Sequence, residues 1–84
     1  MQTRSVESII EDFVRTQFHV ASTDPGFDSQ VDLFERGYID SMGFVELVEF
    51  LNGEFGVEVS DEDLLSDNFS TVAGIAYIVS QTLG

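Results

Sequence analysis

The 84-residue chain contains no cysteine and no lysine, and it has only three arginines and one histidine. Without cysteine, disulfides, thiolate chemistry and sulfur-ligated zinc are excluded. No apolar run approaches the roughly 18 residues that a membrane span requires. The N-terminal sequence also lacks the basic segment and apolar core of a signal peptide. We therefore expect a soluble cytoplasmic protein that does not insert into membranes.

Acidic residues are as abundant as basic ones are scarce. The chain has 16 acids and a formal net charge of -13, and it carries no arginine or lysine after Arg36. Such a surface repels nucleic-acid phosphates and anionic lipids, so we expect no nucleic-acid partner. Its natural partners are basic patches on other proteins, although the acidity could also serve only solubility. The chain is 43% hydrophobic with eight phenylalanines, which is enough to fold.

Apolar residues recur with the period of an α-helix in four segments. The length favours a single domain, residues 1–84, with one modest core. The predicted fold is all-α, with three longer helices, one short third helix and a long first loop. We expect helices from about Ser5 to His19, from Ser41 to about Phe55 with Gly56 as C-cap, over about two turns after Ser60, and after a cap at Ser70 or Thr71. "FGVEVS" could form a brief strand, but a lone strand has no partner.

The first loop spans about 20 residues, and loops of that length are usually functional or pinned to the core. Pro25-Gly26 marks a turn in it. The apolar anchors that we expect to pin it before Ile39 are Val31, Leu33 and Phe34. In the last helix, the predicted core face consists of Val72, Ile75, Ala76, Val79 and Leu83.

The helical period divides the second helix into two faces. The predicted core face consists of Phe44, Leu47, Val48, Leu51 and Phe55. The opposite, outer face holds Met42, Val45, Glu46, Glu49, Asn52 and Gly53. Apolar and acidic residues thus lie together on the outer face, where a partner or a cargo could rest.

Catalytic and metal-binding patterns find little support. The only histidine, His19, is expected at a helix end, where the negative end of the helix dipole explains it. "IDSMG" lacks the first glycine of a nucleophile elbow, and an all-α chain has no strand to form one. A calcium loop starting at Asp24 would use Asp28 and Glu35 but has Ser29 where glycine is required. We expect neither an enzyme nor a metal site.

Once these catalytic and metal-binding patterns are set aside, Ser41 is the candidate functional residue that remains. At a helix start its hydroxyl lies among backbone N–H groups without intrahelical partners, in the positive end of the dipole, where an attached phosphate would be stabilised. Ser41 could instead be only an N-cap. Against that alternative, Asp40 is already an adequate cap.

The stretch "GYIDSM" (37–42) resembles the G-x-[I/L]-D-S-[L/M] signature of acyl and peptidyl carrier proteins, whose serine receives phosphopantetheine from coenzyme A. "FGVEV" (55–59) is similar to the family's exit from the second helix, and "NFSTV" (68–72) to its entry into the last. The resemblance covers roughly residues 30–80 and implies a four-helix acyl-carrier-like bundle. Family members commonly have further acids where this chain has Asn52 and Gly53.

The resemblance implies that Ser41 bears the phosphopantetheine, with Asp40 helping the transferase and its magnesium site to engage. Met42, Val45, Glu46 and Glu49 would form the face that partners recognise. The chain would then be a monomeric stand-alone acyl, D-alanyl or aminoacyl carrier that moves thioester-bound cargo in fatty acid, polyketide or aminoacyl pathways. The implied partners are a phosphopantetheinyl transferase, a loading ligase and downstream synthases or transferases with basic patches. The alternative is a small acidic docking module that binds a basic protein without a prosthetic group.

Overall fold

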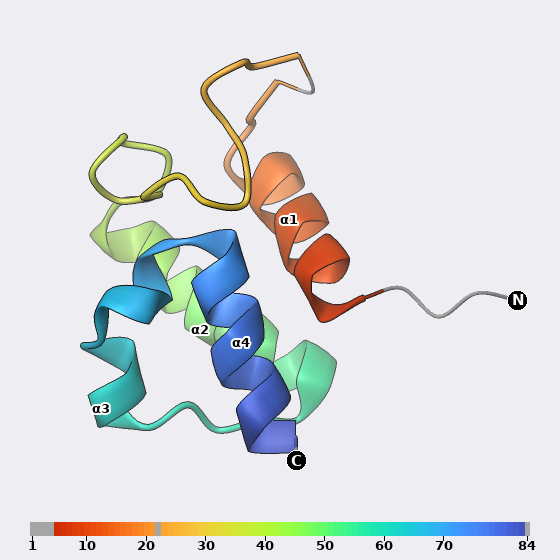
Figure 1. Ribbon diagram of the computed structural model, residues 1–84, viewed down its shortest axis with the longest axis vertical. Helices are drawn as coiled ribbons and strands as arrows, with labels where there is room; N and C mark the ends of the chain where they lie inside the picture. The colour runs from red at the N-terminus through yellow and green to blue at the C-terminus, as the bar shows by residue number, and fades with distance from the viewer. Residues whose placement is uncertain (1–4, 22, 84) are drawn as a thin grey trace, which may run out of the picture.

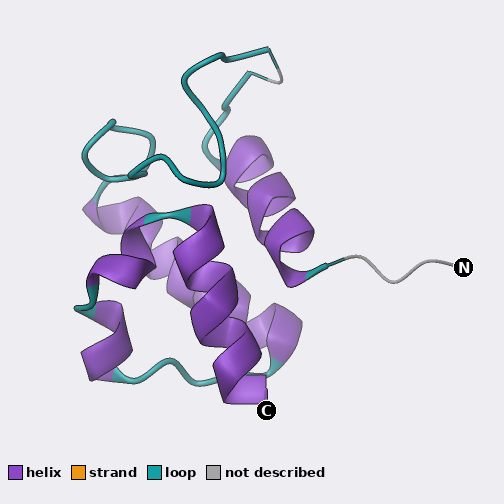
Figure 2. Ribbon diagram, in the orientation of Figure 1, coloured by secondary structure: helices purple, strands orange, loops and turns teal. Residues whose placement is uncertain are grey.

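The computed structural model describes residues 5–21 and 23–83 (Figure 1). Its elements are α1 (Val6–Gln17), α2 (Ser41–Phe55), α3 (Asp61–Leu64), the 3₁₀ turn η1 (Asp67–Ser70) and α4 (Val72–Leu83). The described residues form helices, turns and loops and no strand, as Figure 2 shows. The predicted all-α fold is therefore confirmed, and the segment after Phe55 is a connection rather than a strand.

α4 lies in the middle of the molecule, between α1 on one side and η1 on the other, and α2 passes behind it (Figure 1). The three longer helices all contribute side chains with no exposed surface: Ile10, Val14, Leu47, Leu51, Val72, Ile75 and Val79. Removing such apolar surface from water is the main stabilising contribution in a domain of this size. The core therefore lies where α1, α2 and α4 meet.

α1 is shorter than its predicted range. Ser5 is the N-cap, and its Oγ accepts a hydrogen bond from the Ser8 N–H at 3.1 Å. The helix ends at Gln17 rather than His19, because His19 has a left-handed backbone conformation with φ of 57° that ends the helical path. The Arg15 side chain then fixes the next segment by donating to the Ala21 carbonyl.

α3 is also shorter than predicted. Ser60 caps it as expected, accepting from the Asp63 N–H at 3.2 Å. The helix then ends after a single turn, since the Ser66 N–H and hydroxyl both donate to the Asp63 carbonyl, at 3.1 and 2.9 Å. The chain continues into the separate turn η1, which the sequence patterns did not predict and which buries Phe69.

α4 begins after Thr71, whose Oγ1 accepts from the Gly74 N–H at 2.9 Å. Of the two predicted caps, Thr71 is therefore the one used. A Cβ at Gly74 would overlap the backbone carbonyl oxygen of Asn68, so this glycine allows α4 to lie directly against η1.

The core face of α4 was predicted correctly at Val72, Ile75, Ala76 and Val79 and wrongly at its last member. Leu83 is 54% exposed, because it lies in the last turn, beyond the packed part of the helix. Ile78, which was not predicted on this face, is buried instead. In α2, Leu47 and Leu51 are buried as predicted, and Gly56 has the left-handed conformation of a C-cap.

The long loop between α1 and α2 is pinned to the core, as predicted. Leu33 is fully buried, while Val31 and Phe34 are half-buried against the core. The expected set of anchors omits Phe27, which is buried as well. The Arg15 guanidinium lies over the Phe27 ring at 4.4 Å from its centroid, so a cation–π contact from α1 holds this part of the loop.

Candidate functional site

The segment leading into α2 is held by the backbone of Leu33. The Leu33 N–H donates to the Ser70 carbonyl at 2.7 Å, and the Leu33 carbonyl accepts from the N–H groups of Tyr38 and Ile39 at 2.9 and 3.1 Å. The Ile39 side chain is buried in the core. Because Ile39 points inward, the next two residues of the chain emerge at the surface.

Asp40, not Ser41, is the N-cap of α2. The Asp40 backbone is extended and its Oδ1 accepts from the Gly43 N–H at 2.8 Å. Ser41 is the first helical residue and is exposed. Its hydroxyl makes no hydrogen bond to any other residue that the structure describes. Asp40 therefore caps α2 without Ser41. The Ser41 hydroxyl lies at the positive end of the helix dipole with no bond to another described residue.

The first turn of α2 packs closely against the end of α1. Gly43 is buried, and a Cβ on it would lie 2.6 Å from Cε1 of Phe18 and 2.9 Å from Cγ2 of Ile39. Any larger side chain would therefore have to displace a neighbour. This packing fixes the direction in which the Ser41 end of α2 faces solvent.

The four residues predicted to form a recognition face lie on the exposed side of α2. Met42 and Val45 are large apolar residues that are 72% and 52% exposed, and Glu46 and Glu49 are exposed beside them. Glu46 Oε2 accepts a hydrogen bond from Gln17 Nε2 at 3.0 Å, which joins this face to the end of α1. The face thus presents apolar and acidic side chains together, directly after Ser41.

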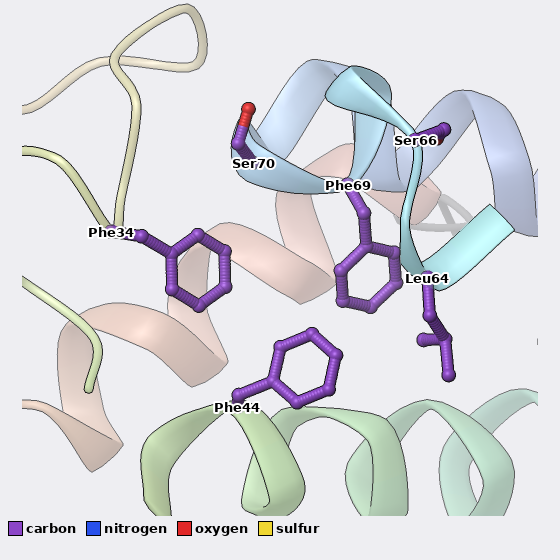
Figure 3. Close-up of a pocket in the computed structure, with 6 residues that line it drawn as sticks. All are labelled: Phe34, Phe44, Leu64, Ser66, Phe69 and Ser70. Carbon is purple, nitrogen blue, oxygen red and sulfur yellow. The ribbon is translucent and has the colours of Figure 1, made fainter. Parts of the chain in front are cut away.

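A cleft of about 200 Å³ lies beside the first turns of α2 (Figure 3). It is lined by Phe34, Phe44, Leu64, Ser66, Phe69 and Ser70. Figure 3 shows the three phenylalanine rings pointing toward one another, with the Phe44 centroid 5.8 Å from that of Phe34 and 5.5 Å from that of Phe69. The serine hydroxyls both donate to carbonyls of their own turns, so the cleft is mainly apolar. Phe44 follows Ser41 by one helical turn, which brings the cleft close to the serine.

Leu65 is a surface residue that the sequence patterns did not single out. It is 87% exposed, the highest value among the exposed large hydrophobic residues. Leu64, next to it, lines the cleft instead. Leu64 is the last residue of α3 and Leu65 is its C-cap, and the two side chains leave this turn in different directions.

The structure gives no support to the metal and catalytic patterns. Among the described residues, no group of histidines and carboxylates could hold a metal ion, and no helix is long and apolar enough to cross a membrane. The Asp24 carboxylate accepts from the Gly26 N–H at 2.8 Å and from the Tyr38 hydroxyl at 3.1 Å. Asp28 similarly accepts from the Gln30 N–H at 2.8 Å. These carboxylates therefore stabilise turns of the loop.

Tyr38 has a shifted acidity in this environment. Burial raises the pKa of Tyr38 above its usual value of 10.0, and the hydrogen bond to the negative Asp24 carboxylate raises it further. The Tyr38 ring also meets Phe27 edge to face, at 5.3 Å between centroids. Tyr38 thus links the middle of the loop to the segment that enters α2.

Comparison with known proteins gives two matches. The family model of the phosphopantetheine attachment site matches residues 8–77. The chain is also similar to the probable acyl carrier protein PigG of Serratia sp. (strain ATCC 39006), with 34% identity over 76 residues that make up 90% of this chain and 86% of that protein. Both matches extend well beyond the Asp40-Ser41 pair, into the helices that surround the cleft.

Proposed function

We propose a function for this chain from its family, because it belongs to the phosphopantetheine-binding carrier proteins. Members of this family are carriers rather than enzymes, and they hold phosphopantetheine as a covalent prosthetic group. The acidic composition alone also allowed a docking module without a prosthetic group. Membership of this family favours a carrier over that alternative.

The proposed attachment point is the Ser41 hydroxyl. The observation that carries this assignment is that Asp40 caps α2 through its bond to the Gly43 N–H, which leaves the exposed Ser41 hydroxyl without a partner among the described residues. A phosphodiester formed there would lie beside the unpaired N–H groups of the first turn, in the positive end of the dipole. This environment supports the proposal that Ser41 reacts and then holds the charged product.

Asp40 would have a second role in this proposal. Its carboxylate lies next to Ser41 in the chain, where it would help the transferase and its magnesium ion to engage. Basic patches on the transferase, on a loading ligase and on downstream synthases would bind the recognition face, which consists of Met42, Val45, Glu46 and Glu49. Electrostatic attraction of this kind raises the encounter rate without a large interface, and added salt weakens it.

The cargo would be an acyl or aminoacyl unit bound as a thioester. The cleft beside Phe44, at about 200 Å³, is somewhat larger than an apolar cavity of about 150 Å³ that holds benzene. It therefore has room for a compact group and not for a long chain in full. We propose that the chain acts as one monomeric cytoplasmic carrier domain over residues 1–84, which moves such cargo between enzymes.

The test is covalent loading. The purified apo protein is incubated with coenzyme A, magnesium and a broad-specificity phosphopantetheinyl transferase, and its intact mass is measured. We expect wild type to gain one phosphopantetheine, Ser41→Ala to gain none, and Ser80→Ala, which removes an exposed serine of α4, to load as wild type does. Loading of Ser41→Ala would show that the site is wrong, and an unmodified wild type would contradict the carrier function.

A further inference from the structure

Arg36 is an exposed cation in the turn that leads to α2. Its guanidinium makes no hydrogen bond or ion pair with any described residue. All 16 acidic side chains of the chain lie among the described residues, since residues 1–4, 22 and 84 include no aspartate or glutamate. Arg36 is therefore paired with none of the chain's own acidic side chains, although these are abundant.

Arg15 provides the contrast, because its guanidinium is used to stabilise the fold. Its Nε donates to Glu11 at 3.2 Å, its Nη1 donates to the Ala21 carbonyl at 3.1 Å, and the guanidinium lies over the Phe27 ring. The Arg36 side chain makes no contact of these three kinds with a described residue. The contacts that hold the loop therefore do not explain why an arginine stands at position 36.

The turn that carries Arg36 is ordered by its backbone. Asp32 Oδ1 accepts from the N–H groups of Phe34 and Glu35 at 3.0 and 2.9 Å. The Asp32 carbonyl accepts from the Arg36 N–H at 3.1 Å, and the Leu33 carbonyl closes the turn on its far side. Figure 1 shows this segment as a closed loop directly before α2. The base of the Arg36 side chain thus has a fixed place at the entry to α2.

Arg36 lies five residues before Ser41. A fully extended backbone of five residues spans at most about 18 Å, and a turn makes the distance shorter. A protein interface of standard size covers about 800 Å² on each partner, which corresponds to a disc of roughly 16 Å radius. An enzyme that reaches the Ser41 hydroxyl is therefore close enough to contact the Arg36 side chain as well.

We propose that Arg36 forms an ion pair with a carboxylate side chain of the phosphopantetheinyl transferase. This inference rests on the proposed attachment at Ser41. The acidic recognition face attracts a basic enzyme surface, but a surface that is basic throughout would repel Arg36. A carboxylate opposite Arg36 removes that repulsion, and the guanidinium can bind it through two hydrogen bonds. One cation among many acids thereby favours one orientation of the docked carrier over the others.

The test measures loading kinetics with the broad-specificity transferase, with the carrier and coenzyme A varied separately. Arg36→Gln makes the chain more acidic, so general attraction to a basic enzyme predicts an equal or lower KM for the carrier. The ion pair predicts the opposite sign. We expect the KM for the carrier to rise at least about threefold, while kcat and the KM for coenzyme A stay unchanged. Arg36→Glu should raise the KM for the carrier further, because it places two carboxylates together.

Gln81→Glu is the matched control, since it makes the net charge more negative by the same one unit, at an exposed position near the end of α4. We expect its KM to equal that of wild type or to lie below it. An unchanged or lower KM for Arg36→Gln would overturn the ion pair, as would an equal rise for Gln81→Glu. A higher KM for coenzyme A instead would assign Arg36 to a phosphate of coenzyme A and would also overturn it.

Two further measurements separate the possible causes of failure. Thermal melts establish that the Arg36 variants are folded, so a higher KM reports docking. If wild type did not load at all, the proposed attachment at Ser41 would fail, and the ion pair with it. If wild type loaded but Arg36→Gln loaded with the same KM, only the ion pair would be contradicted.

Discussion

The starts of α2 and α4 use the same local structure. In each, a capping side chain accepts the N–H of a glycine three residues later: Asp40 from Gly43 at 2.8 Å, and Thr71 from Gly74 at 2.9 Å. In each, the glycine is also required by a close neighbour, a phenylalanine ring in α2 and a backbone carbonyl in α4. Cap and close packing together fix the direction in which each helix begins.

The first helical residues of α2 and α4 nevertheless have opposite environments. Val72 is fully buried in the core, whereas Ser41 is exposed and has no partner for its hydroxyl among the described residues. By contrast, the hydroxyl oxygens of Ser5 and Ser60 accept the capping hydrogen bonds of α1 and α3. Capping by Asp40 therefore leaves the Ser41 hydroxyl without a bond among the described residues, whereas the hydroxyls of Ser5 and Ser60 hold the starts of their helices.

The largest effect that tests this comparison is expected at Gly74. Gly74→Ala places a Cβ on the carbonyl oxygen of Asn68, and this backbone atom can move only if η1 moves as well. We expect a loss of at least about 3 kcal/mol in the free energy of unfolding, measured by urea denaturation. A loss below about 1 kcal/mol would mean that α4 does not depend on this close contact.

A smaller loss is expected at the equivalent glycine of α2. Gly43→Ala meets the Phe18 ring and an Ile39 methyl group, which are side-chain atoms that can shift, so we expect a loss of about 1–2 kcal/mol. The control is Gly53→Ala, since a Cβ there meets nothing and alanine favours the helix by about 1 kcal/mol. Gly53→Ala should therefore raise the free energy of unfolding. If Gly43→Ala raised it as well, the first turn of α2 would not be packed as described.

The two caps should have similar effects on stability and different effects on loading. Asp40→Ala and Thr71→Ala should each lower the free energy of unfolding by about 1 kcal/mol, because each leaves a helix N–H without its acceptor. Asp40→Asn keeps the capping oxygen and should preserve stability. If the Asp40 charge assists the transferase, Asp40→Asn should nevertheless load more slowly than wild type, whereas loading at the wild-type rate would restrict Asp40 to capping.

The smallest effect concerns the loop that leads to α2. Because the folded-state pKa of Tyr38 is raised, folding favours the protonated phenol, so its contribution to stability is present below pH 10.0 and is lost as the pH rises through the folded-state pKa. Ultraviolet titration of a Tyr77→Phe variant, in which Tyr38 is the remaining tyrosine, should show a midpoint above 10.0. Adding Asp24→Asn should move that midpoint down, and an unchanged midpoint would exclude Asp24 as a cause.

The features predicted well from the sequence depend on short-range signals. Both ends of α2 were predicted because Asp40 and Gly56 are local cap residues, and its exposed face followed from the helical period. The resemblance around Ser41 likewise rested on adjacent residues. Such signals require no knowledge of what the rest of the chain does.

The features that were missed depend on contacts between distant parts of the chain. Phe27 is an anchor because Arg15 of α1 covers it. The cleft requires rings from the loop, α2 and η1, and no local pattern brings Phe34, Phe44 and Phe69 together. The early end of α3 depends on Ser66 hydrogen bonds that compete with the helix. Periodicity gives the faces of helices but not which elements will cover them.

The backbone of Leu33 also has a consequence for the order of folding. Its N–H bonds to Ser70, far along the chain, while its carbonyl holds the segment just before Asp40. Contacts between distant residues close large loops, whose entropic cost must be met before the contacts can stabilise the chain. We therefore expect the entry to α2 to become ordered late, after η1 and α4 have docked, so that a partly folded chain presents Ser41 without its fixed surroundings.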